Sequence, residues 1–229
     1  MSERPRGGGR RRLNRFSAET PAETTLIQYY RAYEGRDLWR NPNSVPPLTS
    51  EEVFRNNAPL VLDMGSGKGE LVIDLAEHDP HTNYVGIESH LKSIYCAVYD
   101  VQNRRLPNVR FIKADVRLVS RAIPDESVSE VHFMFPPPVT KLKHANKDLI
   151  TQNIVDELHR ILEPNGLLHL ATDHEPYFNS KRALITGSEK FEEVVYQSGM
   201  EGGKTWYQKI WEGHGLPTHR AKFSKKRAE

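Results

Sequence analysis

Apolar and polar positions alternate along the chain in blocks that predict strands and helices in regular succession from residue 60 onward. Short apolar runs bounded by turn residues predict buried strands, and apolar positions three or four residues apart predict amphipathic helices. The expected strands are 60–64, 83–88, 109–114, 128–135, 167–172, 191–197 and 206–211. The expected helices are 68–78, 90–105, 116–122, 147–162 and 175–187. Strands that alternate with helices predict an α/β fold with a doubly wound, mostly parallel sheet and a late antiparallel strand.

The residues before this alternation have a different pattern. Arginines and the run Gly7-Gly8-Gly9 dominate residues 1–20, which predicts a segment that is disordered when free. Apolar positions at helical spacing predict a short docking helix over 22–33, and prolines and asparagines predict an irregular linker over 35–47. Thr49 or Ser50 is then expected to cap a short helix.

These changes in pattern divide the chain into three parts. Residues 1–49 are expected to form a basic, partly disordered extension and linker. Residues 50–217 are expected to form the α/β domain, and residues 218–229 a basic tail. A length of 229 residues, of which 37% are hydrophobic, is enough for one domain of this kind.

Charge is unevenly spread over a chain whose formal net charge is only +2. Basic residues crowd the start at Arg4, Arg6, Arg10, Arg11, Arg12 and Arg15, and the end at Lys222, Lys225, Lys226 and Arg227. Lysines and arginines that neutralise phosphates release counterions, so two basic ends predict binding to a polyanion such as a nucleic acid. The alternative is a solvated tail that only aids solubility.

Composition excludes several classes of protein. The single cysteine, Cys96, rules out an intramolecular disulfide and a multi-cysteine metal site. His144 and His169 lack a second ligand set at suitable spacing, so no metal is expected. No segment approaches the roughly 20 apolar residues that cross a bilayer, and the arginine-rich start lacks the apolar region of a secretory signal. We therefore expect a cytoplasmic protein that does not bind membranes.

The stretch from Leu60 to Glu70 predicts a ligand-binding loop between a buried strand and a helix. It carries Gly65, Gly67 and Gly69 at alternate positions, which permit positive φ and close approach of a ligand. A dinucleotide loop has the spacing G-x-G-x-x-G, and here the third glycine comes one residue early. Asp63 lies two residues before the first glycine, where it would repel a pyrophosphate but suit the ammonium group of S-adenosylmethionine. The spacing also excludes a Walker loop.

Two further acids close the next two expected strands. Glu88 is placed to accept hydrogen bonds from ribose hydroxyls, and Asp115 from an adenine amino group. Ligands of open α/β sheets bind beyond the carboxyl ends of the strands, where Asp63, Glu88 and Asp115 would meet. Each acid could instead be a helix cap or turn former, but three at successive strand ends favour the cofactor interpretation.

Several motifs, in this order, resemble the tRNA guanine-N7 methyltransferase family from about Leu60 to Ile210. They are the glycine loop, Gly86-Ile87-Glu88, Phe135-Pro136-Pro137-Pro138, Ala171-Thr172-Asp173 and Thr205-Trp206-Tyr207-Gln208. The resemblance implies a Rossmann-like class I methyltransferase fold, S-adenosylmethionine as methyl donor and tRNA as substrate. It also implies that Asp63, Glu88 and Asp115 lie at the cofactor.

The chain departs from the family pattern on the side expected to face guanine. The family has Phe-Pro-Asp-Pro-Trp and then a basic stretch, whereas Pro137 and Val139 stand here in place of the aspartate and tryptophan. The basic stretch is thinner, and its Lys141 would lie near the target nucleotide. Thr205 matches the family's C-terminal motif, but Gln208 replaces a glutamate.

Methylation at guanine N7 needs no general base, because N7 has an in-plane lone pair and no proton. Catalysis is then mainly alignment, and a carboxylate would stabilise the positive charge that develops on the base. Asp173, which closes the fifth strand, is expected to substitute in part for the missing carboxylate, with a helix N-cap as the alternative role. Thr205 and Gln208 are expected to contact substrate.

The sequence therefore predicts methyl transfer to N7 of a guanine in tRNA. The alternatives are a non-catalytic tRNA-binding paralogue, motivated by Pro137 and Gln208, and a methyltransferase with a shifted substrate. A nicotinamide-dependent oxidoreductase is disfavoured by Asp63 and the glycine spacing. A partner protein or a homo-oligomer, and the tRNA position modified, are left open.

Overall fold

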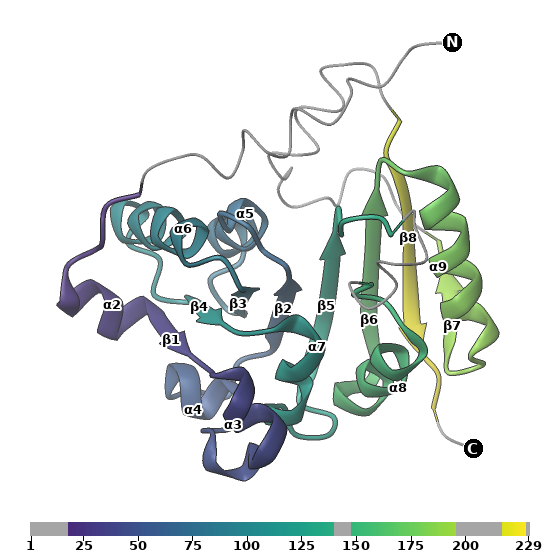
Figure 1. The fold of residues 1–229 in the computed structure, drawn as a ribbon, viewed down its shortest axis with the longest axis horizontal. Helices are drawn as coiled ribbons and strands as arrows, with labels where there is room; N and C mark the ends of the chain where they lie inside the picture. Colours follow the sequence, from purple (N-terminus) through teal and green to yellow (C-terminus); the bar gives the residue numbers. More distant parts are fainter. Residues whose placement is uncertain (1–17, 140–147, 196–216, 228–229) are drawn as a thin grey trace.

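The computed structural model describes residues 18–139, 148–195 and 217–227 (Figure 1). Within them, an 8-stranded sheet has the order β1-β4-β3-β2-β5-β6-β8-β7. The strands are β1 (Tyr30–Ala32), β2 (Leu60–Met64), β3 (Asn83–Glu88), β4 (Val109–Lys113), β5 (Val128–Met134), β6 (Leu162–Thr172), β7 (Phe191–Val194) and β8 (His219–Lys225). Strands β1 to β6 pair in parallel, and β8 is antiparallel to β6 and β7. The predicted doubly wound sheet with a late antiparallel strand is confirmed.

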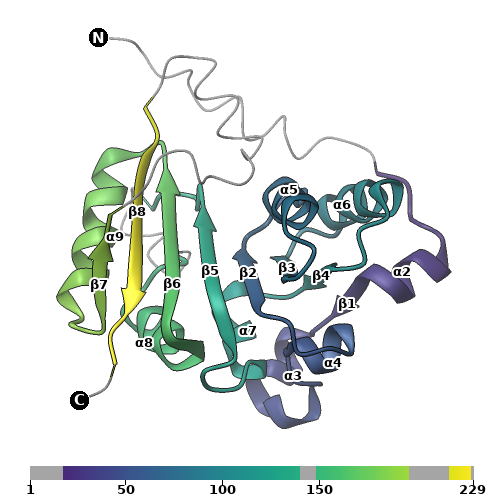
Figure 2. The ribbon, with the colours of Figure 1, turned by 180° about the vertical axis from the view of Figure 1, so that it is seen from behind.

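Helices connect the parallel strands and cover the sheet, as Figures 1 and 2 show from opposite sides. The α-helices are α2 (Glu23–Tyr29), α3 (Gly35–Arg40), α4 (Ser50–Phe54), α5 (Glu70–His78), α6 (Leu91–Arg104), α7 (Val116–Val119), α8 (Gln152–Ile161) and α9 (Glu175–Gly187). Two 3₁₀ turns, η1 (Pro42–Ser44) and η2 (Ser120–Ala122), complete the described elements. No helix in these described ranges is both long and apolar enough to cross a membrane.

The alternation of side chains along each strand creates two hydrophobic cores, one on each face of the sheet. On one face, Val61, Tyr84 and Phe111 pack with the buried residues of α5 and α6. On the other face, Leu62 and Ile87 belong to the larger core that includes buried residues of α8 and α9. Strands β2 and β3 are thereby buried on both faces, which explains the near-continuous apolar run of β2.

The N-terminal expectations are partly wrong. The helix expected over 22–33 ends at Tyr29, and β1 follows it and pairs in parallel with β4. The irregular linker expected over 35–47 instead contains α3 and η1. Leu38 of α3 is fully buried, so packing against the main core compensates for a local sequence that is poor in helix signals. The short helix capped by Thr49 is confirmed, because its side chain accepts a hydrogen bond from the Glu52 amide.

The segment expected as a basic tail over 218–229 contains a strand that the sequence did not predict. Residues 219–225 form β8, which lies between β6 and β7 in both views (Figures 1 and 2). Ala221, Phe223 and Lys225 are buried on one face, and the Lys225 ammonium donates to Leu162 O at 2.7 Å and Glu126 Oε1 at 2.9 Å. The limits of the α/β domain stay a prediction. The strand expected over 206–211 lies outside the described residues.

Candidate functional site

The carboxyl ends of β2, β3 and β4 lie at one edge of the sheet, because the strands are parallel and adjacent. This arrangement brings Asp63, the glycine loop, Glu88 and Asp115 to the same edge, as the sequence predicts. The loop is attached directly to β3, since the amides of Gly65 and Ser66 donate to Ile87 O at 2.8 and 3.0 Å. The site is thus built on the topological region where open α/β sheets bind ligands.

The three loop glycines all adopt the left-handed backbone conformation, with φ of 93°, 57° and 77° at Gly65, Gly67 and Gly69. No heavy atom would lie within 4 Å of a Cβ at Gly65 or Gly67, so the described residues leave open space there. At Gly69, by contrast, a Cβ would lie 2.5 Å from Phe111 Cζ. Gly69 is also the N-cap of α5, so it sets the packing of that helix on the sheet.

Replacement of Gly69 by alanine should destabilise the protein by about 3 kcal/mol, because it combines backbone strain with overpacking against Phe111. Thermal unfolding measures this loss. Gly187→Ala is the matched control, since a Cβ there meets nothing within 4 Å. Equal melting temperatures for the two variants would contradict the close packing at Gly69.

Asp63 is a buried carboxylate without a compensating cation among the described residues. Its exposed fraction is 2%, and its Oδ1 has no hydrogen-bond partner within the parts of the chain that are described. Burial raises the pKa of Asp63 to about 8, and the negative charges of Glu70 and Glu88 add to the effect. An uncompensated acid in this place is unfavourable by itself, so it fits a site that receives a positively charged group from a ligand.

Glu88 holds the glycine loop in place. Its Oε2 accepts a hydrogen bond from the Gly67 amide at 3.0 Å, and its Oε1 accepts from the amides of Ser89 and His90 at 2.7 and 2.8 Å. A carboxylate oxygen has two acceptor sites, so these bonds leave capacity for a ligand hydroxyl. Glu88 therefore shapes the site and can contact what binds in it.

Asp115 is engaged with its own helix. It caps α7 by accepting a hydrogen bond from the Arg117 amide at 2.9 Å, and the Arg117 guanidinium lies 2.5 Å from its Oδ2. Hydrogen bonding by Arg117 lowers the pKa of the Asp115 carboxyl. The helix-cap alternative is therefore realised at this position, and a contact with adenine stays a prediction.

The ends of β5 and β6 are paired neighbours, and they lead to Pro137 and Asp173 respectively. Met134 at the end of β5 pairs with Ala171 in β6, and Pro137 and Asp173 follow these strands within a few residues. Phe135 has a φ of 54°, and its amide donates to Ala171 O at 2.7 Å. A phenylalanine with positive φ is strained by about 1–3 kcal/mol, and this strained residue lies directly between the last residue of β5 and Pro136.

Pro137 is exposed and Asp173 is half-buried, so both are accessible from the solvent side of this edge. Lys141, Thr205 and Gln208, the other expected substrate-binding residues, lie outside the described residues.

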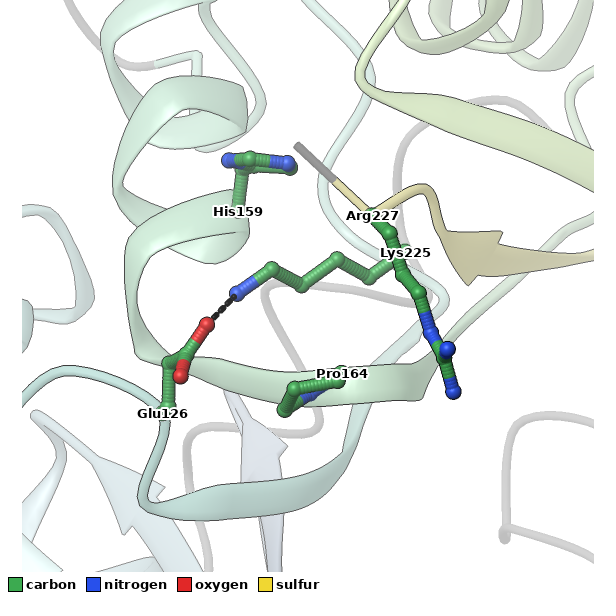
Figure 3. A pocket seen from close by; sticks show the side chains of 5 residues that line it. All are labelled: Glu126, His159, Pro164, Lys225 and Arg227. Atoms are coloured by element: carbon green, nitrogen blue, oxygen red, sulfur yellow. Dashed lines mark hydrogen bonds and ion pairs between the residues drawn. The ribbon is translucent and has the colours of Figure 1, made fainter. Parts of the chain in front are cut away.

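Two features were not predicted from the sequence. Glu130, His132 and His169 meet on β5 and β6, where their ligand atoms lie within 4.8 Å of one another. The i, i+2 spacing of Glu130 and His132 could have indicated that these two side chains share a face of β5. The position of His169 beside them depends on the register between β5 and β6. A pocket of about 420 Å³ lies near the opposite end of the sheet, by the start of β5 and β6 (Figure 3). It is lined by Glu126, His159, Pro164, Lys225 and Arg227, none of which belongs to the predicted site.

Comparison with known proteins identifies related sequences and folds. A family model described as a putative methyltransferase matches residues 57–211. A tRNA (guanine-N(7)-)-methyltransferase of Rubrobacter xylanophilus is 33% identical, over 92% of this chain and 96% of that protein. One of Chloroherpeton thalassium is 30% identical, over 96% of this chain and 100% of that protein.

Solved structures support the fold. The aminoglycoside resistance methyltransferase NpmB1 has a TM-score of 0.57 at 20% identity, covering 78% of this chain and 94% of that one. The 16S rRNA methyltransferase KamB has a TM-score of 0.59 at 14% identity, covering 77% of this chain and 92% of that one. At these identities the likeness shows a Rossmann-like class I fold and no more.

Proposed function

The chain belongs to the tRNA (guanine-N(7)-)-methyltransferase family, and from this premise we propose that it transfers a methyl group from S-adenosylmethionine to N7 of a guanine in tRNA. The observation that carries the proposal is the buried acid group of Asp63, which no described cation pairs with, at the base of an open glycine loop. An ammonium group is the complement that such a carboxylate lacks. The amino-acid end of S-adenosylmethionine supplies one, whereas a nicotinamide dinucleotide would bring a pyrophosphate.

Each cofactor-binding residue has a distinct part in this proposal. Asp63 receives the ammonium group, and Gly65, Gly67 and Gly69 let the backbone approach the ligand closely. Glu88 accepts hydrogen bonds from the ribose hydroxyls while it holds the loop, and Asp115 accepts from the adenine amino group. When bound, S-adenosylmethionine supplies a methyl group on a positively charged sulfur.

The protein's contribution to transfer is alignment and charge. Asp63, Glu88 and the glycine loop would hold the methyl donor, whose methyl group the N7 lone pair of guanine would accept while the donor would be left as a neutral thioether. No proton moves, so no residue has to act as a general base. Asp173 is proposed to lie beside the guanine and to stabilise the positive charge that passes to the ring. Lys141, Thr205, Gln208 and the basic N-terminal run are proposed to contact the tRNA.

Two transcripts of the same tRNA test the proposal, one made with ordinary guanosine and one with 7-deazaguanosine. Labelled methyl groups should enter the first and appear as 7-methylguanosine after nucleoside digestion. The second should accept none, because carbon replaces N7. Label in the deaza transcript would show a shifted substrate atom. Cofactor binding without transfer to any tRNA would support the non-catalytic alternative that Pro137 motivates.

Glu88→Gln should weaken S-adenosylmethionine binding by about tenfold, because an amide nitrogen would face backbone donors that the carboxylate now satisfies. Isothermal calorimetry measures the affinity. Glu192→Gln serves as control, since Glu192 is exposed on β7. If both variants bind as the wild type does, Glu88 is not a cofactor ligand.

A further inference from the structure

Strands β5 and β6 carry a cluster of three side chains that the proposed function does not use. Glu130 and His132 lie two residues apart on one face of β5, and His169 is the register partner of His132 in β6. Glu130 Oε2 lies 2.8 Å from His169 Nε2 and 3.6 Å from His132 Nε2. Two imidazoles therefore direct the same ring nitrogen at one carboxylate oxygen.

His132 is the unsatisfied member of this cluster. Its exposed fraction is 7%, and neither ring nitrogen has a hydrogen-bond partner among the residues described. A buried polar group without a partner is rare in proteins and unfavourable by about 1–3 kcal/mol. Imidazole nitrogens are common metal ligands, and those of His132 are buried without a hydrogen bond that would compete for them among the residues described.

We propose that Glu130, His132 and His169 bind one divalent transition-metal ion of the zinc class. Zinc bonds to histidine nitrogen and carboxylate oxygen are about 2.0–2.2 Å long, so two ligands of one ion lie at most about 4.4 Å apart. The two distances to Glu130 fall within this range, and all three ligand atoms lie within 4.8 Å of one another. Two imidazoles with one carboxylate favour zinc and its neighbours over magnesium or calcium, which prefer oxygen ligands.

The two rings must move slightly to share an ion. They are stacked with centroids 4.3 Å apart and planes 9° apart, so an ion in the plane of one ring lies outside the plane of the other. Rotation of His169 solves this conflict, because its side chain is 13% exposed and Glu130 is the group that its Nε2 contacts within the cluster. Glu130 would then lose its contact with His169 Nε2 and bind the ion instead.

The positive charge of Lys222 disfavours the binding of a metal ion at this cluster. Lys222 is the β8 register partner of His169, and its positive charge acts on His132. A cation at the cluster would be repelled by the lysine ammonium. Removal of this charge should therefore strengthen metal binding, which is a response that a purely structural histidine pair would not give.

An ion at this position would join β5 to β6 directly. The carboxyl ends of these two strands lead to Pro137 and Asp173, so the ion would restrain the part of the sheet that carries the proposed guanine site. This inference does not depend on the proposed function, because the ligands are described residues and the test uses no tRNA.

Zinc titration of the full, tag-free chain after chelator dialysis tests the proposal. Calorimetry should show one ion per chain with a dissociation constant of about 1 μM or tighter. His169→Gln should raise this constant at least about tenfold, and Lys222→Gln should lower it by about threefold or more. Cobalt in place of zinc should give visible d–d absorption bands in the wild type and lose them in His169→Gln.

His81→Gln controls for adventitious binding, because His81 is exposed and far from the cluster in sequence. Circular dichroism checks that each variant is folded. If His169→Gln does not fold, the change in zinc affinity of Lys222→Gln tests the proposal by itself. The proposal is overturned if the wild type binds no zinc, if His81→Gln weakens binding as much as His169→Gln, or if Lys222→Gln leaves the affinity unchanged.

Discussion

Asp63→Asn is expected to unfold at a higher temperature than the wild type without ligand, and yet to bind S-adenosylmethionine at least about tenfold more weakly. The gain in stability follows from removal of a buried charge that the described residues do not neutralise, and is on the order of 2 kcal/mol at pH 8. The loss of affinity follows because a neutral amide cannot pair with an ammonium group. Thermal unfolding and calorimetry measure the two effects on the same samples.

The difference in stability between Asp63→Asn and the wild type should change with pH in a defined direction. The pKa of Asp63 is raised from 3.8 to about 8 in the folded protein, so between these values the native state holds a proton that the unfolded state has lost. The stability contributed by this group therefore falls as the pH rises from about 4 to about 8, and is constant outside that window. The Asp63→Asn variant lacks this dependence, so its advantage should grow from pH 5 to pH 8.

Asp74→Asn provides the control on the neighbouring helix. The side chain of Asp74 is 38% exposed and lies 3.7 Å from the exposed His78, so its loss should change stability by less than about 0.5 kcal/mol. An Asp63→Asn variant that melts with the wild type at every pH would refute the buried charge. Full cofactor affinity in that variant would remove Asp63 from the binding site.

Asp173→Ala should lower methyl transfer at least about a hundredfold while cofactor affinity stays within about twofold of the wild type. The expectation rests on position, because Asp173 follows β6 and lies next to the strand end where Pro137 occupies the family's aspartate position. Single-turnover transfer to tRNA measures the chemical step, and calorimetry measures the cofactor. Glu175→Ala, in the exposed first turn of α9, is the control.

A rescue experiment sharpens this prediction. If Asp173 has taken over the missing carboxylate's part, Pro137→Asp in the Asp173→Ala background should recover a measurable fraction of transfer. Undiminished transfer in Asp173→Ala alone would show that another group stabilises the charge on guanine.

Sequence periodicity predicts the central part of the fold because most elements from residue 60 to 187 are marked by strong local signals. Strand β2 and helix α9 have the predicted bounds for this reason. Strand β1 was missed because three residues after a helix carry no readable alternation, and its position depends on pairing with β4. In β8 the alternation of side chains exists, but basic residues on both faces of the strand obscure it. The burial of Lys225 depends on tertiary structure, because its ammonium donates hydrogen bonds to Glu126 and to Leu162 O.

The contrast between local sequence signals and pairing with distant strands also explains which site residues the sequence predicts. Asp63, Glu88 and Asp115 each close a strand, so their common edge follows from the rule for parallel sheets, and their contacts with a cofactor stay predictions. Glu130 and His169 are separated by 39 positions, and their contact depends on the register of β6, which begins with an irregular stretch. No local pattern encodes that register.

The two outer strands of the sheet have a consequence for behaviour at high concentration. Strand β1 has three residues and β7 has four, and β7 exposes Glu192 and Glu193. Long, flat and apolar edge strands act as templates for pairing with another molecule, whereas short and charged ones offer few hydrogen bonds and repel each other. Among the described residues, this eight-stranded sheet therefore ends in edges that discourage its growth into intermolecular β-structure.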